Sequence, residues 1–371
     1  MVPDARVILL GTNGDSLRRH VRVLAAAVVL SSALTASTLL TAQPGHAQAE
    51  VDGIVATRLV SPWGLTFLPD GSALVSERDT ALIKRIPADG GRVTTVGRVT
   101  GVRPAGEGGL LGIAVPPGPN PNAVYAYYTG SRDNRVVRLA WDGVRLGRQR
   151  AILTGIPKNT IHNGGRLLFS PDGALYIGTG DAGDAARSQD PDDLAGKVLR
   201  IRPDGRPDPR NSDPTSPVFT LGHRNVQGLA LDSAGRVWAT EFGQSDADEL
   251  NVLRAGGNYG WPQVEGVGND PGLVDPRATW SPTSTASPSG LAIHDGVAYV
   301  ASLRGEVLWQ VPLDGTRAGR PSAAPLGDLG RLRTIGVAPD GALWLITSNT
   351  DGRGSPGSTD DRILRLTVGD G

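Results

Sequence analysis

The sequence predicts an all-β fold, a six-bladed β-propeller with four-stranded blades. A phrase of two apolar runs joined by a turn recurs six times, at intervals of roughly 45 to 65 residues. No segment carries a long apolar stripe with the period of a helix. The 51 glycines and 28 prolines supply the turns that many short strands require. A β-sandwich would also contain alternating strands, but it would not repeat a phrase at this period.

Each copy of the phrase supplies two strands of one blade, and further short apolar runs supply the others. The six copies cover residues 62–76, 109–128, 166–178, 227–240, 289–301 and 334–346. The additional strands fall near residues 81–86, 135–139, 197–201, 307–311 and 362–366. Pro-Asp-Gly recurs between paired runs, because proline presets φ and glycine accepts a positive φ.

Composition excludes several classes of protein. The 371 residues contain no cysteine, so disulfides and thiolate metal sites are absent. The 37 basic residues balance the 37 acidic ones, and only three of the basic residues are lysines. Nothing in this balance indicates a nucleic-acid or membrane-binding surface.

The N-terminal segment is expected to be a signal peptide over residues 1–49, followed by one propeller domain over residues 50–371. Arg18, Arg19 and Arg22 precede an apolar segment, and the small-residue ending Ala47-Gln-Ala49 resembles a cleavage site. Serines and threonines interrupt the apolar segment, which favours a signal peptide over a permanent membrane anchor. We therefore expect an exported protein, secreted or periplasmic. General secretion and twin-arginine export both stay open.

The first candidate functional residue is His162, which precedes the third repeat in the stretch from 161 to 181. It is followed by Asn163-Gly-Gly165, a loop flexible enough to wrap a ligand. A loop ahead of an inner strand faces the central pocket of a propeller, and imidazole is the natural base near neutral pH. The alternative is an ordinary hydrogen-bonded surface histidine.

Arg224 and Asn225 also lie directly ahead of an inner strand. The arginine offers a planar fork suited to a carboxylate, and the asparagine offers both a donor and an acceptor. A hydrogen-bond network between blades is an equally good interpretation of this pair.

An acidic run over residues 241–249, followed by Gly256–Trp261, contains hard oxygen ligands in a tight loop. Calcium takes carboxylates and backbone carbonyls together, although the spacing here is not that of an EF-hand. The alternative is a solvated acidic loop.

Three arginines late in the chain complete the candidate site. Arg331 and Arg333 are two residues apart and would share one face of a strand. Two such guanidinium groups repel each other unless an anion lies between them; alternatively both face solvent beside Asp328. Together with Arg304 and Arg224, they place one histidine and four arginines at one end of the propeller. Such a pocket fits a small polyanion that needs a divalent cation.

At these residues the sequence resembles the soluble PQQ-dependent sugar dehydrogenases, the glucose/sorbosone or aldose sugar dehydrogenase family. The resemblance runs from about residue 55 to residue 366. Its most specific phrases are Gly106-Glu-Gly-Gly-Leu-Leu-Gly112, His162-Asn-Gly-Gly-Arg-Leu167, Gln189-Asp-Pro191, Gly196-Lys-Val-Leu-Arg200, Gly222-His-Arg-Asn-Val-Gln-Gly228 and Gly256-Gly-Asn-Tyr-Gly-Trp-Pro262.

The resemblance implies a quinoprotein with PQQ and Ca²⁺ as cofactors. His162 would match the general base. The cofactor contacts would come from Arg224, Asn225, Arg304, Arg331 and Arg333, with Trp280 lining the pocket. The carbonyls of Gly243 and Gln244 would hold the calcium of the cofactor, and Glu249 and Tyr259 would bind a second, structural calcium.

Four positions depart from the family pattern. Glu107 stands where glucose-active members carry glutamine, which places an extra negative charge near a tricarboxylate. Gln244 stands where proline occurs, Arg304 where lysine occurs, and Ala247 where another acid can occur.

The resemblance implies oxidation of an aldose at C1 to the lactone, with hydride transfer to PQQ. A calcium-dependent lactonase and a non-catalytic binding propeller are the alternatives, because propellers host many functions. The arginine cluster argues against the lactonase, which needs convergent acidic and amide groups around one metal. The sequence assigns neither the sugar, the electron acceptor nor the oligomeric state.

Overall fold

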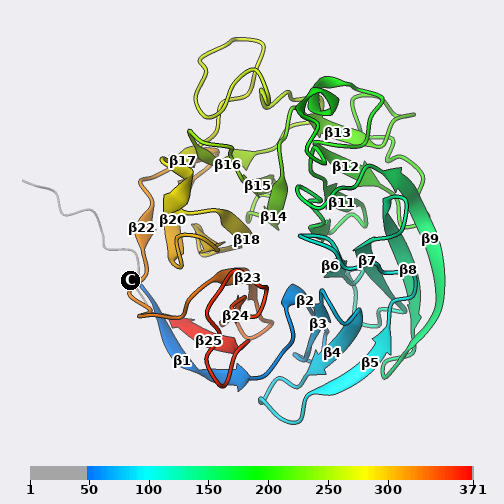
Figure 1. Ribbon diagram of the computed structural model, residues 1–371, viewed down its shortest axis with the longest axis vertical. Helices are drawn as coiled ribbons and strands as arrows, with labels where there is room; N and C mark the ends of the chain where they lie inside the picture. The colour runs from blue at the N-terminus through cyan, green and yellow to red at the C-terminus, as the bar shows by residue number, and fades with distance from the viewer. Residues whose placement is uncertain (1–47, 370–371) are drawn as a thin grey trace, which may run out of the picture. The chain divides into compact units, whose positions relative to one another are not determined.

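The computed structural model describes residues 48–369, which all lie in one compact unit. Their strands form six antiparallel sheets arranged around a common axis (Figure 1). In this part of the chain the only helical segments are two short 3₁₀ turns, η1 (Ala185–Gln189) and η2 (Thr283–Thr285). The predicted six-bladed propeller is therefore confirmed.

The first three blades follow one another along the chain, each built from four strands. Blade 1 comprises β2 (Pro62–Phe67), β3 (Ala73–Glu77), β4 (Leu82–Ile86) and β5 (Thr94–Arg98). Blade 2 comprises β6 (Leu110–Ala114), β7 (Ala123–Thr129), β8 (Asn134–Trp141) and β9 (Leu146–Ile156). Blade 3 comprises β10 (Leu167–Phe169), β11 (Leu175–Gly178), β12 (Lys197–Ile201) and β13 (Val218–Leu221).

The last three blades repeat the plan with additions at the edge. Blade 4 comprises β14 (Val226–Leu231), β15 (Val237–Glu241), β16 (Asp248–Val252) and β17 (Ala278–Trp280). Blade 5 comprises β18 (Pro288–His294), β19 (Val297–Ser302), β20 (Leu308–Asp314), β21 (Arg317–Ala318) and β22 (Ser322–Ala323). Blade 6 comprises β23 (Leu332–Val337), β24 (Leu343–Thr347), β25 (Ile363–Val368) and the first strand of the described chain, β1 (Ala49–Ala56).

The ring closes through blade 6, because β1 pairs with β25 in antiparallel register from Ala49↔Val368 to Ala56↔Ile363. The two ends of the described chain are thus joined by backbone hydrogen bonds in one sheet. The first strands of successive blades contact one another around the axis, and β23 of the last blade contacts β2 of the first. Closing the ring leaves no blade with an unpacked face.

The apolar core lies in layers between neighbouring blades. Between blades 2 and 3, the buried side chains of Tyr125, Tyr127, Leu175 and Leu199 pack in one cluster. The hydroxyl of Tyr127 has no exposed surface and donates a hydrogen bond to the backbone carbonyl of Asn163 at 2.8 Å. The core therefore fixes the loop that follows His162.

The strand order decides which loops meet. In an antiparallel blade, the start of the first strand and the end of the second strand lie at the same edge. Loops that precede β6, β10, β14 and β23 therefore gather at one end of the axis with the loops that follow β3, β11, β15, β19 and β24. The predicted site residues lie on these loops or at these strand ends, apart from Glu249, which lies in β16, and Tyr259 and Trp280.

The expected leader lies outside the described residues except for Gln48 and Ala49. Ala49 already belongs to β1, and its backbone N–H donates to Oε1 of Gln310 at 3.2 Å. Cleavage next to Ala49 stays a prediction. Across residues 48–369 we find no helix with the length and apolar character of a membrane span.

Candidate functional site

The loop that carries His162 has an unusual backbone. His162 has a φ of 53°, and Gly164 and Gly165 have φ values of 60° and 111°. A Cβ added to Gly164 would lie 2.5 Å from backbone atoms of Thr179, and one added to Gly165 would lie 2.7 Å from the Leu111 side chain. The two glycines thus allow the loop to pack closely between blades 2 and 3.

The imidazole of His162 is held by Asp181, from the loop that follows β11. Nδ1 of His162 lies 2.7 Å from Oδ1 of Asp181, and Asp181 also accepts hydrogen bonds from the backbone N–H of Gly183 and from Nε1 of Trp261, at 2.7 and 2.9 Å. Burial opposes ionisation of Asp181, but the hydrogen bonds and the charge of His162 outweigh burial and lower its pKa. An ionised Asp181 accepts the Nδ1 proton, which leaves Nε2 of His162 as the free acceptor.

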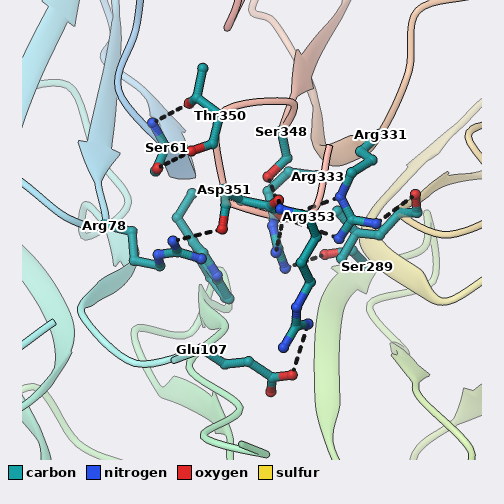
Figure 2. Close-up of polar contacts among 12 residues, drawn as sticks. Ser61, Arg78, Glu107, Ser289, Arg331, Arg333, Ser348, Thr350, Asp351 and Arg353 are labelled. Atoms are coloured by element: carbon teal, nitrogen blue, oxygen red, sulfur yellow. Dashed lines mark hydrogen bonds and ion pairs between the residues drawn. The ribbon is translucent and has the colours of Figure 1, made fainter. Parts of the chain in front are cut away.

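Glu107 binds the same loop from the other side. Its Oε2 accepts a hydrogen bond from the backbone N–H of His162 at 2.8 Å, and its own N–H donates to the carbonyl of Thr160 at 2.8 Å. Its Oε1 lies 3.1 Å from Nη1 of Arg353, in the loop between β24 and β25. Glu107 thus joins loops from three parts of the ring; its contact with Arg353 is drawn in Figure 2.

Arg331 and Arg333 share a face and are buried, with exposed fractions of 8% and 7%. The anion between them is Asp351, whose Oδ2 lies 3.1 Å from Nη2 of Arg331 and 3.8 Å from Nη2 of Arg333 (Figure 2). Arg78 donates to the carbonyl of Asp351 at 3.2 Å and pairs with Asp79 at 2.8 Å. Of the two interpretations left open by the sequence, the structure supports the arginine pair around an anion; neither arginine faces solvent.

Arg333 is buried, which is unfavourable for a charged side chain. Burial lowers its pKa to about 9, although Asp351 opposes the shift. Its guanidinium lies 5.6 Å from the ring centre of Trp63, and that of Arg166 lies 4.3 Å from the same ring. Burial also lowers the pKa of Arg166 to about 9, with repulsion from Arg333 adding to the effect. Two buried cations thus flank one indole.

These side chains surround a pocket near the axis. Its lining consists of Trp63, Arg78, Glu107, Asn163, Gly164, Gln227, Phe242, Leu303, Arg333, Asp351 and Arg353. The free volume between them is about 20 Å³. That volume holds about one water molecule, so a ligand of several rings enters only when side chains at the mouth move aside.

Arg224 and Asn225 lie beside this pocket. Arg224 stacks over Trp261 at 5.4 Å and donates from Nη1 to the carbonyl of Gly243 at 2.7 Å. Asn225 is fully buried, and its Oδ1 accepts hydrogen bonds from the N–H of Gly164 and from Nε2 of Gln227, both at 3.1 Å. These contacts form the hydrogen-bond network between blades that was the alternative to a ligand-binding role for Arg224 and Asn225. The network does not use every hydrogen-bond donor of the two side chains.

Three buried donors in this region lack an acceptor among the described residues. They are Nε of Arg224, Nδ2 of Asn225 and Nε of Arg333. Buried donors normally find a partner, so three such groups around one pocket indicate that an acceptor-rich ligand completes the site. Carboxylates and quinone carbonyls are acceptors of this kind, and a flat aromatic ligand would suit Trp63 and Phe242. The residues present therefore fit PQQ.

The predicted calcium loop is shaped by Glu265. One oxygen, Oε1 of Glu265, accepts hydrogen bonds from the backbone N–H groups of Gln244, Ser245, Asp246 and Ala247, at 2.6 to 3.1 Å. No group of three or more His, Cys, Asp or Glu side chains able to hold a metal occurs between Gln48 and Gly369. A calcium here would therefore depend on backbone carbonyls and ligand oxygens, the donors expected of Gly243 and Gln244.

Glu249 is buried in blade 4 on the strand that follows this loop. Its Oε1 accepts from the N–H of Gly266 at 2.7 Å and its Oε2 from Nδ2 of Asn251 at 2.9 Å. Burial first, and repulsion from Glu241 second, raise the pKa of Glu249 to about 8. A cation would relieve both effects, which fits the predicted structural calcium.

Tyr259, the other expected ligand of the structural calcium, packs near Glu241 and Glu249. Its ring stacks on His223 with 4.6 Å between ring centres. Nδ1 of His223 lies 2.7 Å from Oε2 of Glu241. Through His223, Tyr259 is therefore linked to Glu241 on β15. Glu241 lies opposite Glu249 on the neighbouring strand β16.

Of the predicted histidine and cofactor-binding residues, Glu107 and Arg333 line the pocket, whereas His162, Arg224, Asn225, Arg331, Trp280 and Arg304 do not. Trp280 and Arg304 are the two that also take no part in the contacts described above. Trp280 ends β17, the outer strand of blade 4, and packs in the core between blades 4 and 5, with Trp309 at 6.2 Å. A Trp-Ser-Pro phrase carries no signal of radial position, which explains why the sequence could not place it. Arg304 follows β19 near the pocket residue Leu303, but its side chain is exposed.

Several important residues were not singled out by the sequence. Asp181, Arg78, Asp351 and Arg353 all follow the second strand of a blade. The sequence could have indicated them, because a charged residue in the loop after the second strand lies at the same end of the axis as the loops that precede the inner strands. Trp63 lies on inner strand β2, where its repeat phrase resembled scaffold.

Comparison with known proteins identifies the family of the chain. A family model described as Glucose / Sorbosone dehydrogenase matches residues 59–364. The chain is 52% identical to the PQQ-bound form of aldose sugar dehydrogenase from Streptomyces coelicolor, with a TM-score of 0.85 over 88% of this chain and 100% of that one.

Two characterised relatives are more distant. Quinoprotein glucose dehydrogenase B of Acinetobacter calcoaceticus is 30% identical over 288 residues, which cover 67% of this chain and 59% of that protein. Aldose sugar dehydrogenase of Escherichia coli is 26% identical over 352 residues, covering 85% and 94%. The match of the family model over most of the propeller confirms the resemblance, and the chain belongs to the glucose/sorbosone dehydrogenase family.

Proposed function

We propose that this protein is an exported PQQ- and calcium-dependent dehydrogenase that oxidises an aldose at C1 to the lactone. The observation that carries the proposal is the His162–Asp181 pair, with a 2.7 Å contact, beside a pocket lined by arginines. The pair supplies a base near neutral pH, and the arginines supply the charge that a tricarboxylate requires. Family membership favours this function over a lactonase or a binding protein.

His162 would act as the general base. The Asp181 carboxylate holds the proton on Nδ1, so Nε2 of the neutral imidazole accepts the proton of the anomeric hydroxyl. Asp181 then stabilises the imidazolium that results. When bound, PQQ and Ca²⁺ would supply the acceptor for the C1 hydride and its Lewis-acid activation.

The cofactor would be held by the buried arginine pair and by side chains with unpartnered donors. Arg331 and Arg333 would bind carboxylates, and Arg224 and Asn225 would donate from their unpartnered Nε and Nδ2 atoms. The carbonyls of Gly243 and Gln244 would ligate calcium. Since Gly243 now accepts from Arg224, that guanidinium would release the carbonyl when the metal binds.

The test is reconstitution of purified protein with PQQ and calcium, followed by dye reduction across a panel of aldoses. We expect turnover that needs both additions, and none with His162→Ala despite retained PQQ binding. A protein that binds no PQQ in the presence of calcium would overturn the proposal. Hydrolysis of aldonolactones without PQQ would instead establish the lactonase.

A further inference from the structure

The mouth of the pocket is crossed by one ion pair, between Glu107 and Arg353 at 3.1 Å (Figure 2). Glu107 precedes β6, whereas Arg353 follows β24, so 246 positions separate them along the chain. The Arg353 side chain is 56% exposed and that of Glu107 is 23% exposed. This pair is the only ion pair of Glu107 within residues 48–369.

The charges that line the pocket give this pair its importance. The lining contains three arginines, Arg78, Arg333 and Arg353, and two carboxylates, Glu107 and Asp351. Asp351 is already matched by Arg331 and Arg333. Without Arg353 the lining would hold two cations and two anions, and Glu107 would keep no ion pair. A polyanionic ligand would then meet an unpaired carboxylate at the mouth.

Glu107 nevertheless has a structural task at this position. Its Oε2 holds the backbone N–H of His162 at 2.8 Å, at a residue whose φ is 53°. That task needs an acceptor oxygen, not a charge, and a glutamine amide oxygen could perform it. The negative charge is therefore separable from the hydrogen bond, which makes its consequence testable.

We propose that Arg353 is the charge-compensating residue of the pocket: it neutralises Glu107 and so keeps the mouth favourable for an anionic cofactor. This proposal rests on the proposed function, because the anion concerned is PQQ.

The experiment is a double-mutant cycle of Glu107→Gln and Arg353→Gln. PQQ affinity is measured in the presence of calcium by quenching of tryptophan fluorescence, at low and high salt. Arg353→Gln should weaken PQQ binding about tenfold at low salt, because Glu107 is then unpaired. Glu107→Gln should strengthen binding, because Arg353 is released toward the ligand. The double variant should return close to the wild-type affinity, and high salt should shrink all three differences.

Arg206→Gln is the matched control, because Arg206 also loses one exposed ion pair, with Asp204, in the loop between β12 and β13. Its PQQ affinity should equal that of the wild type. Thermal unfolding of each variant without PQQ checks that the fold is retained. If Arg353→Gln binds PQQ as tightly as or more tightly than the wild type, Arg353 only obstructs the mouth and the proposal is wrong. Failure of the wild type itself to bind PQQ would overturn the proposed function instead.

Discussion

Nδ1 of His162 and Oδ1 of Asp181 lie 2.7 Å apart, although the two residues come from different loops of blade 3. Trp261, from blade 4, donates to the second oxygen of the same carboxylate at 2.9 Å. The orientation of the imidazole is therefore set by two blades. This contact fixes the ring of His162, as the proposed role of a general base requires.

Asp181→Asn should lower turnover by roughly 10²–10⁴-fold while PQQ affinity changes little. The amide can donate to Nδ1, which would favour the imidazole tautomer whose Nε2 carries the proton. Steady-state rates and PQQ titration measure the two effects separately. Equal losses of turnover and of PQQ binding would show that Asp181 supports the pocket rather than the base.

His162→Ala and Arg331→Ala should fail in different ways. Removing the imidazole should lower turnover by roughly 10²-fold or more with PQQ binding nearly intact. Removing Arg331 should weaken PQQ binding first, because it takes away a carboxylate partner. Turnover unaffected by His162→Ala would rule out the assigned role.

Asp351→Asn should destabilise the apo-protein by about 3–5 kcal/mol, because it removes the counter-charge of two buried arginines. Asp351 has a side chain only 3% exposed and lies near both Arg331 and Arg333. Urea unfolding measures the loss, and an excess of PQQ should recover part of it. The control is Asp340→Asn, whose 56% exposed carboxylate pairs with Arg365 on the outer surface and should cost at most about 1 kcal/mol. Equal losses for both variants would contradict the prediction.

Calcium should stabilise the protein through Glu249 and the backbone carbonyl of Tyr259, without PQQ present. A ligand that binds only the native state at a hundredfold excess over Kd adds about 2.7 kcal/mol. Chelation should therefore lower Tm, and Glu249→Gln should abolish the response to calcium. A Tm unchanged after exhaustive calcium removal would count against this metal site.

Lys197 gives a pH dependence of stability that is independent of the pocket. Its amine is buried and donates to the carbonyls of Arg187 and Ala195, and burial lowers its pKa to about 8. The unfolded chain keeps the ordinary value near 10.5. The unfolded state therefore binds more protons between these values, so the contribution of Lys197 to stability rises from about pH 8 to about pH 10.5 and is lost as pH falls back.

Urea unfolding of the wild type and of Lys197→Met at several pH values isolates the contribution of Lys197 to the free energy of unfolding. The free-energy difference between them should move in favour of the wild type by up to about 1.4 kcal/mol per pH unit in that window. Parallel stability curves across the window would mean that the lysine titrates normally.

The sequence by itself determined the propeller, because the repeated phrase and its turns encode strand pairs that form locally. It also indicated His162, Arg224, Arg331 and Arg333, because residues directly ahead of an inner strand, or near its start, always reach the same end of the axis. Two guanidinium groups on one face need an anion between them unless both face solvent, and the sequence left both possibilities open without naming Asp351.

Only the tertiary structure decided which side chains complete the site. Asp181 and Asp351 meet their partners within one blade, where loops at the same end of an antiparallel sheet come together. Arg353 meets Glu107 through closure of the ring, across 246 positions of the chain. The structure also placed Trp280 in the core between blades rather than in the pocket lining. Strand periodicity tells which face a residue occupies, but the distance from the axis and the pairing of charges depend on how six blades pack around it.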